Sequence, residues 1–247
     1  MRFELTQSAS DRPANRRISL MAGLALLVAM FMLTTLMPSQ AAAKGKTDRN
    51  ACQLEVIEAI LDAMENDIIP KTEKAVLFGN KVFGAAILKK SDLSLVVAAT
   101  NHESLSPLWH GEIMAMKEFW QMHKPFRIDP KDAIFFATHE PCPYCMAAIT
   151  WNGFDNFYFL FSYEDSKKSF KIPYDLKILK DVFKLGPGGY SHENSFWTAY
   201  NIKDMVKNCP ADKKAKLEAR IKKIAAKYDK MSADYQQVKA KTIIPFK

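Results

Sequence analysis

The sequence predicts an α/β layered domain followed by one long amphipathic helix. Two observations lead to this fold class. Segments with apolar residues at helical spacing alternate with short apolar runs that are typical of strands, in the order helix, hairpin, helix, strand, helix, strand. That alternation is typical of a sheet covered by helices. In addition, apolar residues near the C-terminus recur at alternating spacings of four and three, which predicts a helix that buries one stripe.

The first elements are predicted from their local patterns. Apolar side chains at helical spacing predict a helix at the start of the domain: Leu54, Ile57, Leu61 and Met64. Residues 82–100 are typical of two strands joined by a polar turn over residues 89–92. A loop over residues 101–109 then leads into a second helix over residues 110–123.

The second half of the domain continues the alternation. Residues 133–138 and 156–162 are apolar and aromatic, which predicts two buried strands. Residues 146–151 predict a helix between them, and a further short helix is expected over residues 195–206. Pro210 separates that helix from the C-terminal one, so we expect a catalytic domain over residues 44–209 and a basic helical tail over residues 210–247.

Residues 1–43 have the features of an export signal, in the expected order. Arg16 and Arg17 precede an apolar run over residues 18–37, and a small-residue cleavage site follows at residues 41–43. The run is also about long enough to span a bilayer, so an uncleaved membrane anchor stays open as an alternative. The paired arginines loosely resemble a twin-arginine signal, which leaves the export route open. We expect a periplasmic or secreted protein.

The positive charge of the chain is concentrated in its tail. Without residues 1–43, which contain four Arg and two acidic residues, the net charge falls from +8 to +8 − 2 = +6. Residues 212–241 contain ten Lys or Arg against four Asp or Glu, a surplus of 10 − 4 = +6. A solvated helix face accounts for this charge, so we expect no nucleic-acid partner. We expect a membrane contact only if the signal stays uncleaved.

The tail also has an apolar stripe with a heptad pattern: Leu217, Ile221, Ile224, Tyr228, Met231, Tyr235 and Val238. A helix with such a stripe must bury it. It can pack on its own domain, on the same helix of a second subunit in a homodimer, or on another protein. The sequence leaves these three alternatives open.

Cys142 and Cys145 lie at a junction between a predicted strand and a predicted helix. A thioredoxin-like redox pair would occur in an early βαβ unit, which is not the case here. A structural zinc site needs four protein ligands, and the two other cysteines, Cys52 and Cys209, form no second Cys-x-x-Cys. Three protein ligands with one open position are the catalytic arrangement of zinc.

The segment "WHGEI" supplies the missing groups. His110 opens a predicted helix and is the expected third ligand, and Glu112 brings a carboxylate that need not bind the metal. His-x-Glu followed about 30 residues later by Pro-Cys-x-x-Cys is the signature of zinc base deaminases. Zinc lowers the pKa of bound water to about 7. Glu112 is then expected to move protons from that water to the ring nitrogen and to the leaving ammonia.

Residues 76–165 resemble the cytidine and deoxycytidylate deaminase superfamily, nearest the branch of guanine deaminases and tRNA adenosine deaminases. The resemblance is carried by "FGAAIL" (83–88), "HGEI" (110–113) and "EPCPYCMAAITW" (140–151). It implies a three-layer α/β/α fold with a mixed central sheet and one zinc ion per chain. The implied activity is hydrolytic removal, as ammonia, of an exocyclic amine from a free nucleobase or nucleoside of guanine, cytosine or adenosine type.

The same resemblance implies the residues that contact the substrate. Asn101 is expected to hydrogen-bond the base, and Phe83 and Trp109 to stack on it. The backbone N–H of Gly111, at a helix N-terminus, is expected to point at a polar group of the substrate. The segment "SPLW" (106–109) departs from the family's usual Asp-Pro-Thr-Ala. Because these residues shape the substrate pocket in relatives, the resemblance predicts the reaction but not the identity of the substrate.

Two other classes of function remain as alternatives. One is an exported zinc-binding or interaction protein without turnover, against which Glu112 argues, because a structural site has no use for that acid. The other is a deaminase that acts on nucleic acid, which only the basic tail supports.

Cys52 and Cys209 are candidates for a disulfide, because disulfides persist outside the cytoplasm. The alternative is two free, buried thiols. A bond between them would tie the C-terminal helix to the catalytic domain.

Overall fold

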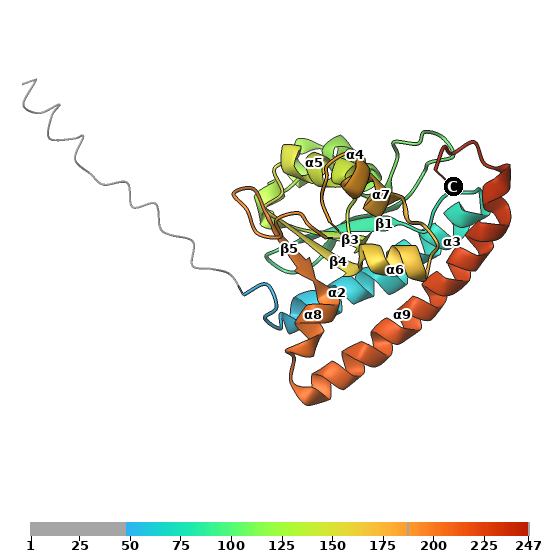
Figure 1. The fold of residues 1–247 in the computed structure, drawn as a ribbon. Coiled ribbons are helices and arrows are strands. Elements are labelled where there is room, and N and C mark those ends of the chain that lie inside the picture. The colour runs from blue at the N-terminus through green and yellow to red at the C-terminus, as the bar shows by residue number, and fades with distance from the viewer. Residues whose placement is uncertain (1–47, 187, 247) are drawn as a thin grey trace, which may run out of the picture. The chain divides into compact units, whose positions relative to one another are not determined.

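The computed structural model describes residues 48–186 and 188–246, so the predicted export signal over residues 1–43 lies outside the described residues. The described chain contains a mixed five-stranded sheet with the strand order β2-β1-β3-β4-β5 (Figure 1). Antiparallel pairing joins β1 to both β2 and β3, and parallel pairing joins β3 to β4 and β4 to β5. The strands are β1 (Gly84–Lys89), β2 (Leu95–Thr100), β3 (Ala133–His139), β4 (Asn156–Phe161) and β5 (Thr198–Asn201).

Helices cover both faces of this sheet. Side chains of β1 alternate between the two faces: Ala86 and Leu88 belong to one apolar core, and Ala85 and Ile87 to the other. The first core is covered by α2 (Leu54–Ala63), α3 (Ile69–Leu77), α8 (Ile202–Lys207) and α9 (Ala211–Val238). The second is covered by α4 (Gly111–Gln121) and α5 (Pro143–Trp151). The predicted three-layer α/β/α fold with a mixed sheet is therefore confirmed.

Short elements complete the described chain. A π-helical turn (Met64–Ile68) joins α2 to α3 just before Pro70, which lacks the N–H that a regular helix would use there. Two short helices follow β4, namely α6 (Tyr163–Lys168) and α7 (Tyr174–Asp181). Single 3₁₀ turns occupy Lys124–Phe126, Pro130–Asp132 and Lys239–Lys241.

The expectation of one helix over residues 195–206 is wrong. This segment forms β5 and then α8. Two-residue alternation explains the strand: Trp197 and Ala199 face the second core, whereas Tyr200 faces the first and stacks on Tyr158 of β4 at 4.4 Å. Asn201 ends the strand and caps α8, because its Oδ1 accepts the backbone N–H of Lys203 at 2.9 Å.

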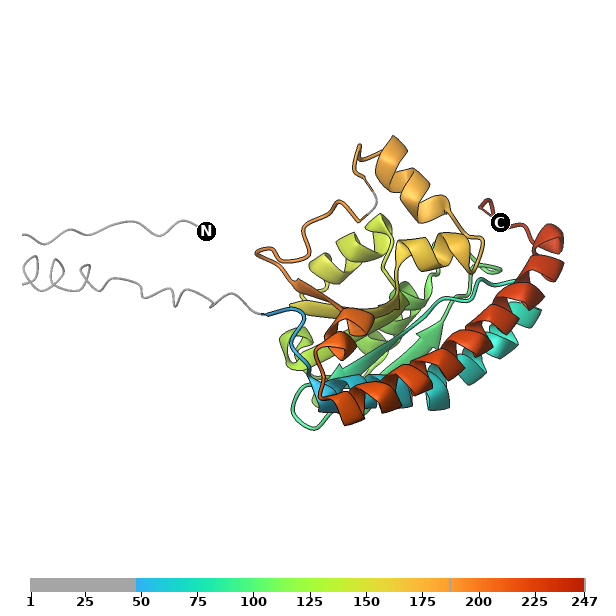
Figure 2. The ribbon, with the colours of Figure 1, turned by 60° about the horizontal axis from the view of Figure 1, so that its bottom comes forward.

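The apolar stripe of α9 packs on its own domain. Six of its seven members are buried in the first core, and only Val238 is half-buried. Helix α9 lies along α3, as both views show (Figure 2). An ion pair joins it to the turn after α2, since Arg220 Nη2 lies 2.6 Å from Glu65 Oε2. Of the three alternatives for burying the stripe, the structure shows the packing of the helix on its own domain.

A disulfide fixes the beginning of α9 to the beginning of α2. Cys52 and Cys209 are bonded, with their Cα atoms 4.9 Å apart and a sequence separation of 157. The free thiols of the described residues are Cys142 and Cys145, both buried. The two cysteine pairs therefore have separate roles, one as a covalent link and one as a candidate metal site.

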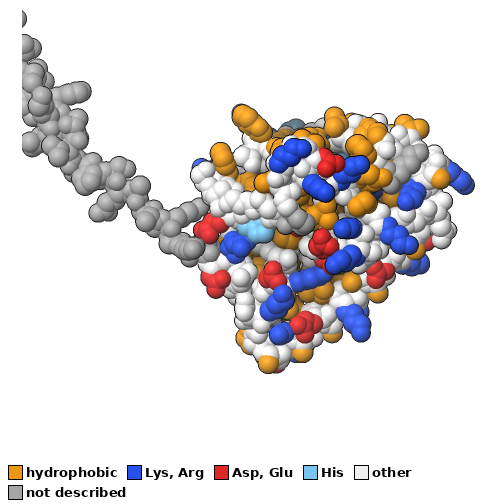
Figure 3. Space-filling view, viewed as in Figure 1, with side chains coloured by type: hydrophobic (Ala, Val, Ile, Leu, Met, Phe, Trp, Pro, Cys, Tyr) orange, Lys and Arg blue, Asp and Glu red, His pale blue; other side chains and the backbone are white. Residues whose placement is uncertain are grey.

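The visible surface carries charges of both signs. Lys and Arg side chains are interspersed with Asp and Glu over the face in Figure 3 rather than gathered in one field. This distribution agrees with a solvated outer face for α9. Within residues 48–246 as described, no helix combines the length and the apolar character needed to cross a bilayer.

Candidate active site

Two glycines place His110 against the sheet. His110 is the N-cap of α4, and Gly111 is the first residue of that helix. A Cβ atom on Gly111 would lie 2.6 Å from Gly84 Cα, and a Cβ on Gly84 would lie 2.9 Å from the carbonyl oxygen of Ala99. The start of α4 can therefore approach β1 only because Gly111 lacks a side chain, and the missing side chain of Gly84 lets β1 lie close to Ala99 of β2.

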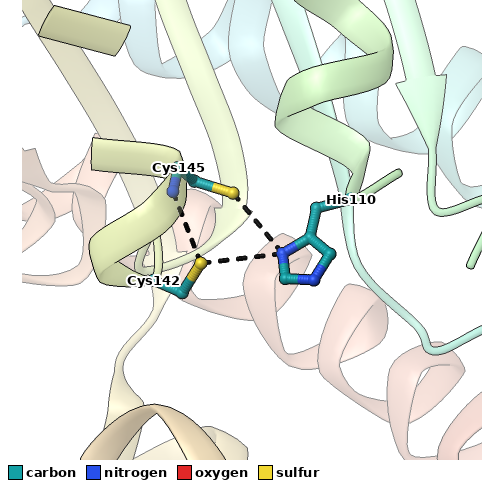
Figure 4. Close-up of side chains that lie close together, drawn as sticks. All are labelled: His110, Cys142 and Cys145. Carbon is teal, nitrogen blue, oxygen red and sulfur yellow. Dashed lines mark hydrogen bonds between the residues drawn. The ribbon is translucent and has the colours of Figure 1, made fainter. Parts of the chain in front are cut away.

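Cys142 and Cys145 are held by the junction between β3 and α5. Cys142 is the N-cap of α5, and Pro143 occupies the first helical position, where its missing N–H costs no hydrogen bond. The backbone N–H of Cys145 donates to Cys142 Sγ over 3.4 Å. Both sulfur atoms then point toward His110 (Figure 4).

The three side chains form a preassembled set of metal donors. His110 Nδ1 lies 3.6 Å from Cys142 Sγ and 3.5 Å from Cys145 Sγ, and the three ligand atoms lie within 4.8 Å of one another. Zinc bonds of about 2.05 Å to nitrogen and 2.3 Å to sulfur at tetrahedral angles put nitrogen and sulfur roughly 3.6 Å apart. The donor set therefore fits a tetrahedral zinc ion with three protein ligands.

The charges of this cluster favour a cation. A hydrogen bond with Cys145 lowers the pKa of Cys142 well below its ordinary value, whereas burial raises the pKa of Cys145. Burial opposes charge on His110, but the hydrogen bond and the charge of Cys142 outweigh it and raise the pKa of His110 to about 9. A proton on His110 thus pairs with the negative charge of the Cys142 thiolate. A bound metal ion would replace that proton and neutralise the same charge.

Glu112 lies beside the cluster, one residue into α4. Its side chain is buried, at 6% exposure. Burial raises the pKa of Glu112 to about 7, and the negative charge of Cys142 adds to the effect. A carboxyl group with a pKa near neutrality can both take up and release a proton at physiological pH, which is what a general acid–base catalyst requires.

Residues 62–161 match the family described as "Cytidine and deoxycytidylate deaminase zinc-binding region". The match contains both halves of the donor set as well as Glu112. Over these residues the chain is similar to that deaminase family. Zinc is accordingly the metal that the His/Cys/Cys cluster is built to bind.

Proteins that are similar to this chain include guanine deaminases. The guanine deaminase of Bacillus subtilis (strain 168) is 32% identical over 71 residues, which are 28% of this chain and 43% of the relative. The chain thus matches less than half of that relative's length. The solved guanine deaminase from Nitrosomonas europaea has a TM-score of 0.41 and 14% identity, covering 72% of this chain and 95% of that one. That from Bacillus subtilis has a TM-score of 0.38 and 20% identity, covering 54% and 80%.

A small cavity of about 70 Å³ adjoins His110 in the deaminase region. Phe83, an expected substrate contact, lines it. Trp109 lies elsewhere: it packs against the second core, with Lys117 Nζ 4.6 Å above its ring. Of the two expected stacking residues only Phe83 lines this cavity, and its other aromatic residues are Tyr174 and Phe246.

Asn101 and Gly111 contact each other in this structure. The backbone N–H of Gly111 donates to Asn101 Oδ1 over 2.6 Å. The Nδ2 of Asn101 donates to Glu103 Oε2 over 2.8 Å. Both expected substrate contacts thus brace the start of α4, and either would have to break this bond to reach a ligand.

Sequence reasoning missed much of the cavity wall. Lys81 and Glu103 line it as a buried ion pair, and Asp175 of α7 lines it as well. Residues 244–246, beyond α9, close it as well. Burial raises the pKa of Asp175 to about 8, and the charge of Cys142 acts in the same direction. In the sequence, the available signal for the ion pair was the lysine of "NKVF" (80–83) and the glutamate of "NHES" (101–104).

Proposed function

We propose that this protein is a zinc-dependent hydrolytic deaminase that removes the exocyclic amine of a free nucleobase or nucleoside and releases ammonia. The observation that carries the proposal is the buried Glu112 beside the His110, Cys142 and Cys145 donor set. A structural zinc site gains nothing from an acid at this position, because burying a carboxyl group costs free energy. This favours an enzyme over a zinc-binding protein without turnover.

The side chains have separable tasks in the reaction. One zinc ion per chain, held by the His/Cys/Cys set, supplies a nucleophile at neutral pH, because zinc lowers the pKa of bound water to about 7. Glu112 would accept one proton from the attacking water and pass it to the ring nitrogen, and would then take the second proton from the new hydroxyl group and give it to the leaving amine, which departs as ammonia. Its pKa of about 7 suits both directions of transfer.

Guanine is the base that we favour as substrate. The similarity to the guanine deaminase of Bacillus subtilis supports it. Asp175 adds support from the cavity wall. A buried carboxyl group gains free energy from hydrogen bonds to a ligand, and guanine presents a ring N–H beside its exocyclic amine.

An activity panel tests the reaction and the substrate together. Ammonia release would be measured from guanine, cytosine, adenosine and single-stranded oligonucleotides with zinc-loaded protein. Glu112→Gln should keep the metal and lose turnover by at least about 100-fold, the scale of lost general acid–base catalysis. Glu118→Gln, an exposed change on the same helix, is the matched control. A Glu112→Gln variant as active as the control would refute the assigned mechanism.

The proposal places the enzyme outside the cytoplasm, in the periplasm or secreted. The predicted signal over residues 1–43 and the Cys52–Cys209 disulfide support this location, since disulfides persist in oxidising compartments. Cell fractionation and N-terminal sequencing of the native protein test it. A cytoplasmic protein that keeps Met1 would contradict export, and a membrane fraction that keeps residues 18–37 would indicate the anchor.

A further inference from the structure

Lys81 and Glu103 form a buried ion pair next to the zinc-binding cluster. Lys81 Nζ donates to Glu103 Oε1 over 2.6 Å, and their side chains are 7% and 2% exposed. The other carboxylate oxygen, Oε2, accepts Asn101 Nδ2 at 2.8 Å and the backbone N–H of Lys81 at 3.3 Å. A buried carboxylate is tolerated only when it is paired in this way. Glu103 is therefore fixed in position.

This fixed carboxylate faces the back of the His110 ring. Glu103 Oε1 lies 3.7 Å from His110 Nε2. On the other side of the ring, Nδ1 faces Cys142 Sγ and Cys145 Sγ, as Figure 4 shows. A carboxylate can only accept hydrogen bonds. The charge of Glu103 therefore favours a proton on Nε2, which leaves the lone pair of Nδ1 free for the metal.

We propose that Glu103 is a positioning residue for zinc, which selects the Nδ1-binding form of His110. The proposal rests on the zinc site of the proposed function. In metal sites generally, the ring nitrogen of histidine that does not bind the metal faces a carboxylate, a carbonyl or water, and this raises the basicity of the ligand. Here the carboxylate comes from the loop before α4.

A purely structural role for the pair would have a different signature. Lys81 precedes β1, and Glu103 follows β2, so their contact also links two segments of chain. If that link were its only function, removing either partner would harm the site equally. If Glu103 acts on His110, its loss weakens zinc binding whereas the loss of Lys81 does not. The two partners are thus distinguishable.

The experiment measures the zinc dissociation constant by chelator competition in the full, disulfide-bonded protein. The variants are Glu103→Gln, Lys81→Met and the double variant, with Glu118→Gln as the exposed control. Glu103→Gln should weaken zinc binding by about 10- to 100-fold, the usual effect of losing such a partner. The double variant should bind zinc about 10- to 100-fold more weakly than Lys81→Met. Because it removes both charges of the pair, it leaves no unpaired buried charge and can replace Glu103→Gln if that variant fails to fold. Lys81→Met alone should bind zinc as tightly as the parent.

Two results would overturn the inference. One is a double variant that binds zinc as tightly as Lys81→Met. The other is an equal loss of affinity in Lys81→Met and Glu103→Gln, which is the signature of a simple link. Ammonia release by the parent is a separate readout: a parent that binds zinc but releases no ammonia refutes the proposed activity and leaves the affinity comparison valid.

Discussion

Replacing His139 by leucine is expected to make the fold less sensitive to acid. His139 ends β3 and is buried, at 4% exposure. Its ring lies 4.5 Å from that of Phe83 and 5.5 Å from that of Tyr228, measured between centroids. Its Nε2 has no hydrogen-bond partner in the structure, while Nδ1 lies 2.9 Å from Thr138 Oγ1. A protonated imidazole would be poorly solvated in these surroundings.

Burial lowers the pKa of His139 to about 3 from an ordinary value of 6.5. The unfolded chain therefore binds this proton first, and the folded state loses stability as the pH falls below 6.5. From pH 7 to pH 5 the linkage relation gives a loss of about 2 kcal/mol from this one side chain. Above pH 6.5 the His139 imidazole is neutral in both the folded and the unfolded chain, so the loss of stability occurs only at acidic pH.

Urea unfolding at pH 7 and pH 5 measures this loss. The parent should lose about 2 kcal/mol more than His139→Leu between the two pH values, because leucine fills the site without a titrating group. The exposed His123→Leu is the control and should behave as the parent. Equal losses in the parent and in His139→Leu would show that the buried imidazole does not resist protonation.

Three further changes test the packing around the site. Cys52→Ser or Cys209→Ser should lower the free energy of unfolding by up to about 5 kcal/mol, as the chain-entropy estimate gives for so long a loop; equal denaturation midpoints of oxidised and reduced protein would contradict this. Ile224→Ala should cost about 2–5 kcal/mol in urea unfolding because the side chain is fully buried, whereas the exposed Lys223→Ala should cost almost nothing. Gly111→Ala should reduce the zinc content, measured by metal analysis, since its Cβ would meet Gly84; a full complement of zinc would show that α4 can shift without loss.

The metal-binding half of the site follows from local sequence. The Cys-x-x-Cys at a strand-to-helix junction and His-x-Glu at a helix start each bring their own geometry. Both predicted junctions are present, with His110 and Cys142 as N-caps. A capping position fixes the direction of a side chain through backbone geometry alone, so a motif of four or five residues is enough to predict it.

The cavity wall could not be predicted in the same way. Asp175 and residue Ile244 reach it from segments outside the matched family region. Their place depends on how α7 and α9 pack, which no local pattern encodes. The short β5 was missed for a similar reason, because its four residues are stabilised by pairing with β4 rather than by their own propensity.

The cavity has a consequence for the order of events in folding. Its wall joins Phe83, His110, Asp175 and Ile244, so contacts around a space of about 70 Å³ bridge more than 150 positions of the chain. Contacts of such high order form slowly, since a long loop must close before they contribute. We therefore expect secondary structure to be recovered early during refolding and the environment of the cavity late, with Cys52–Cys209 shortening the search when it is already closed.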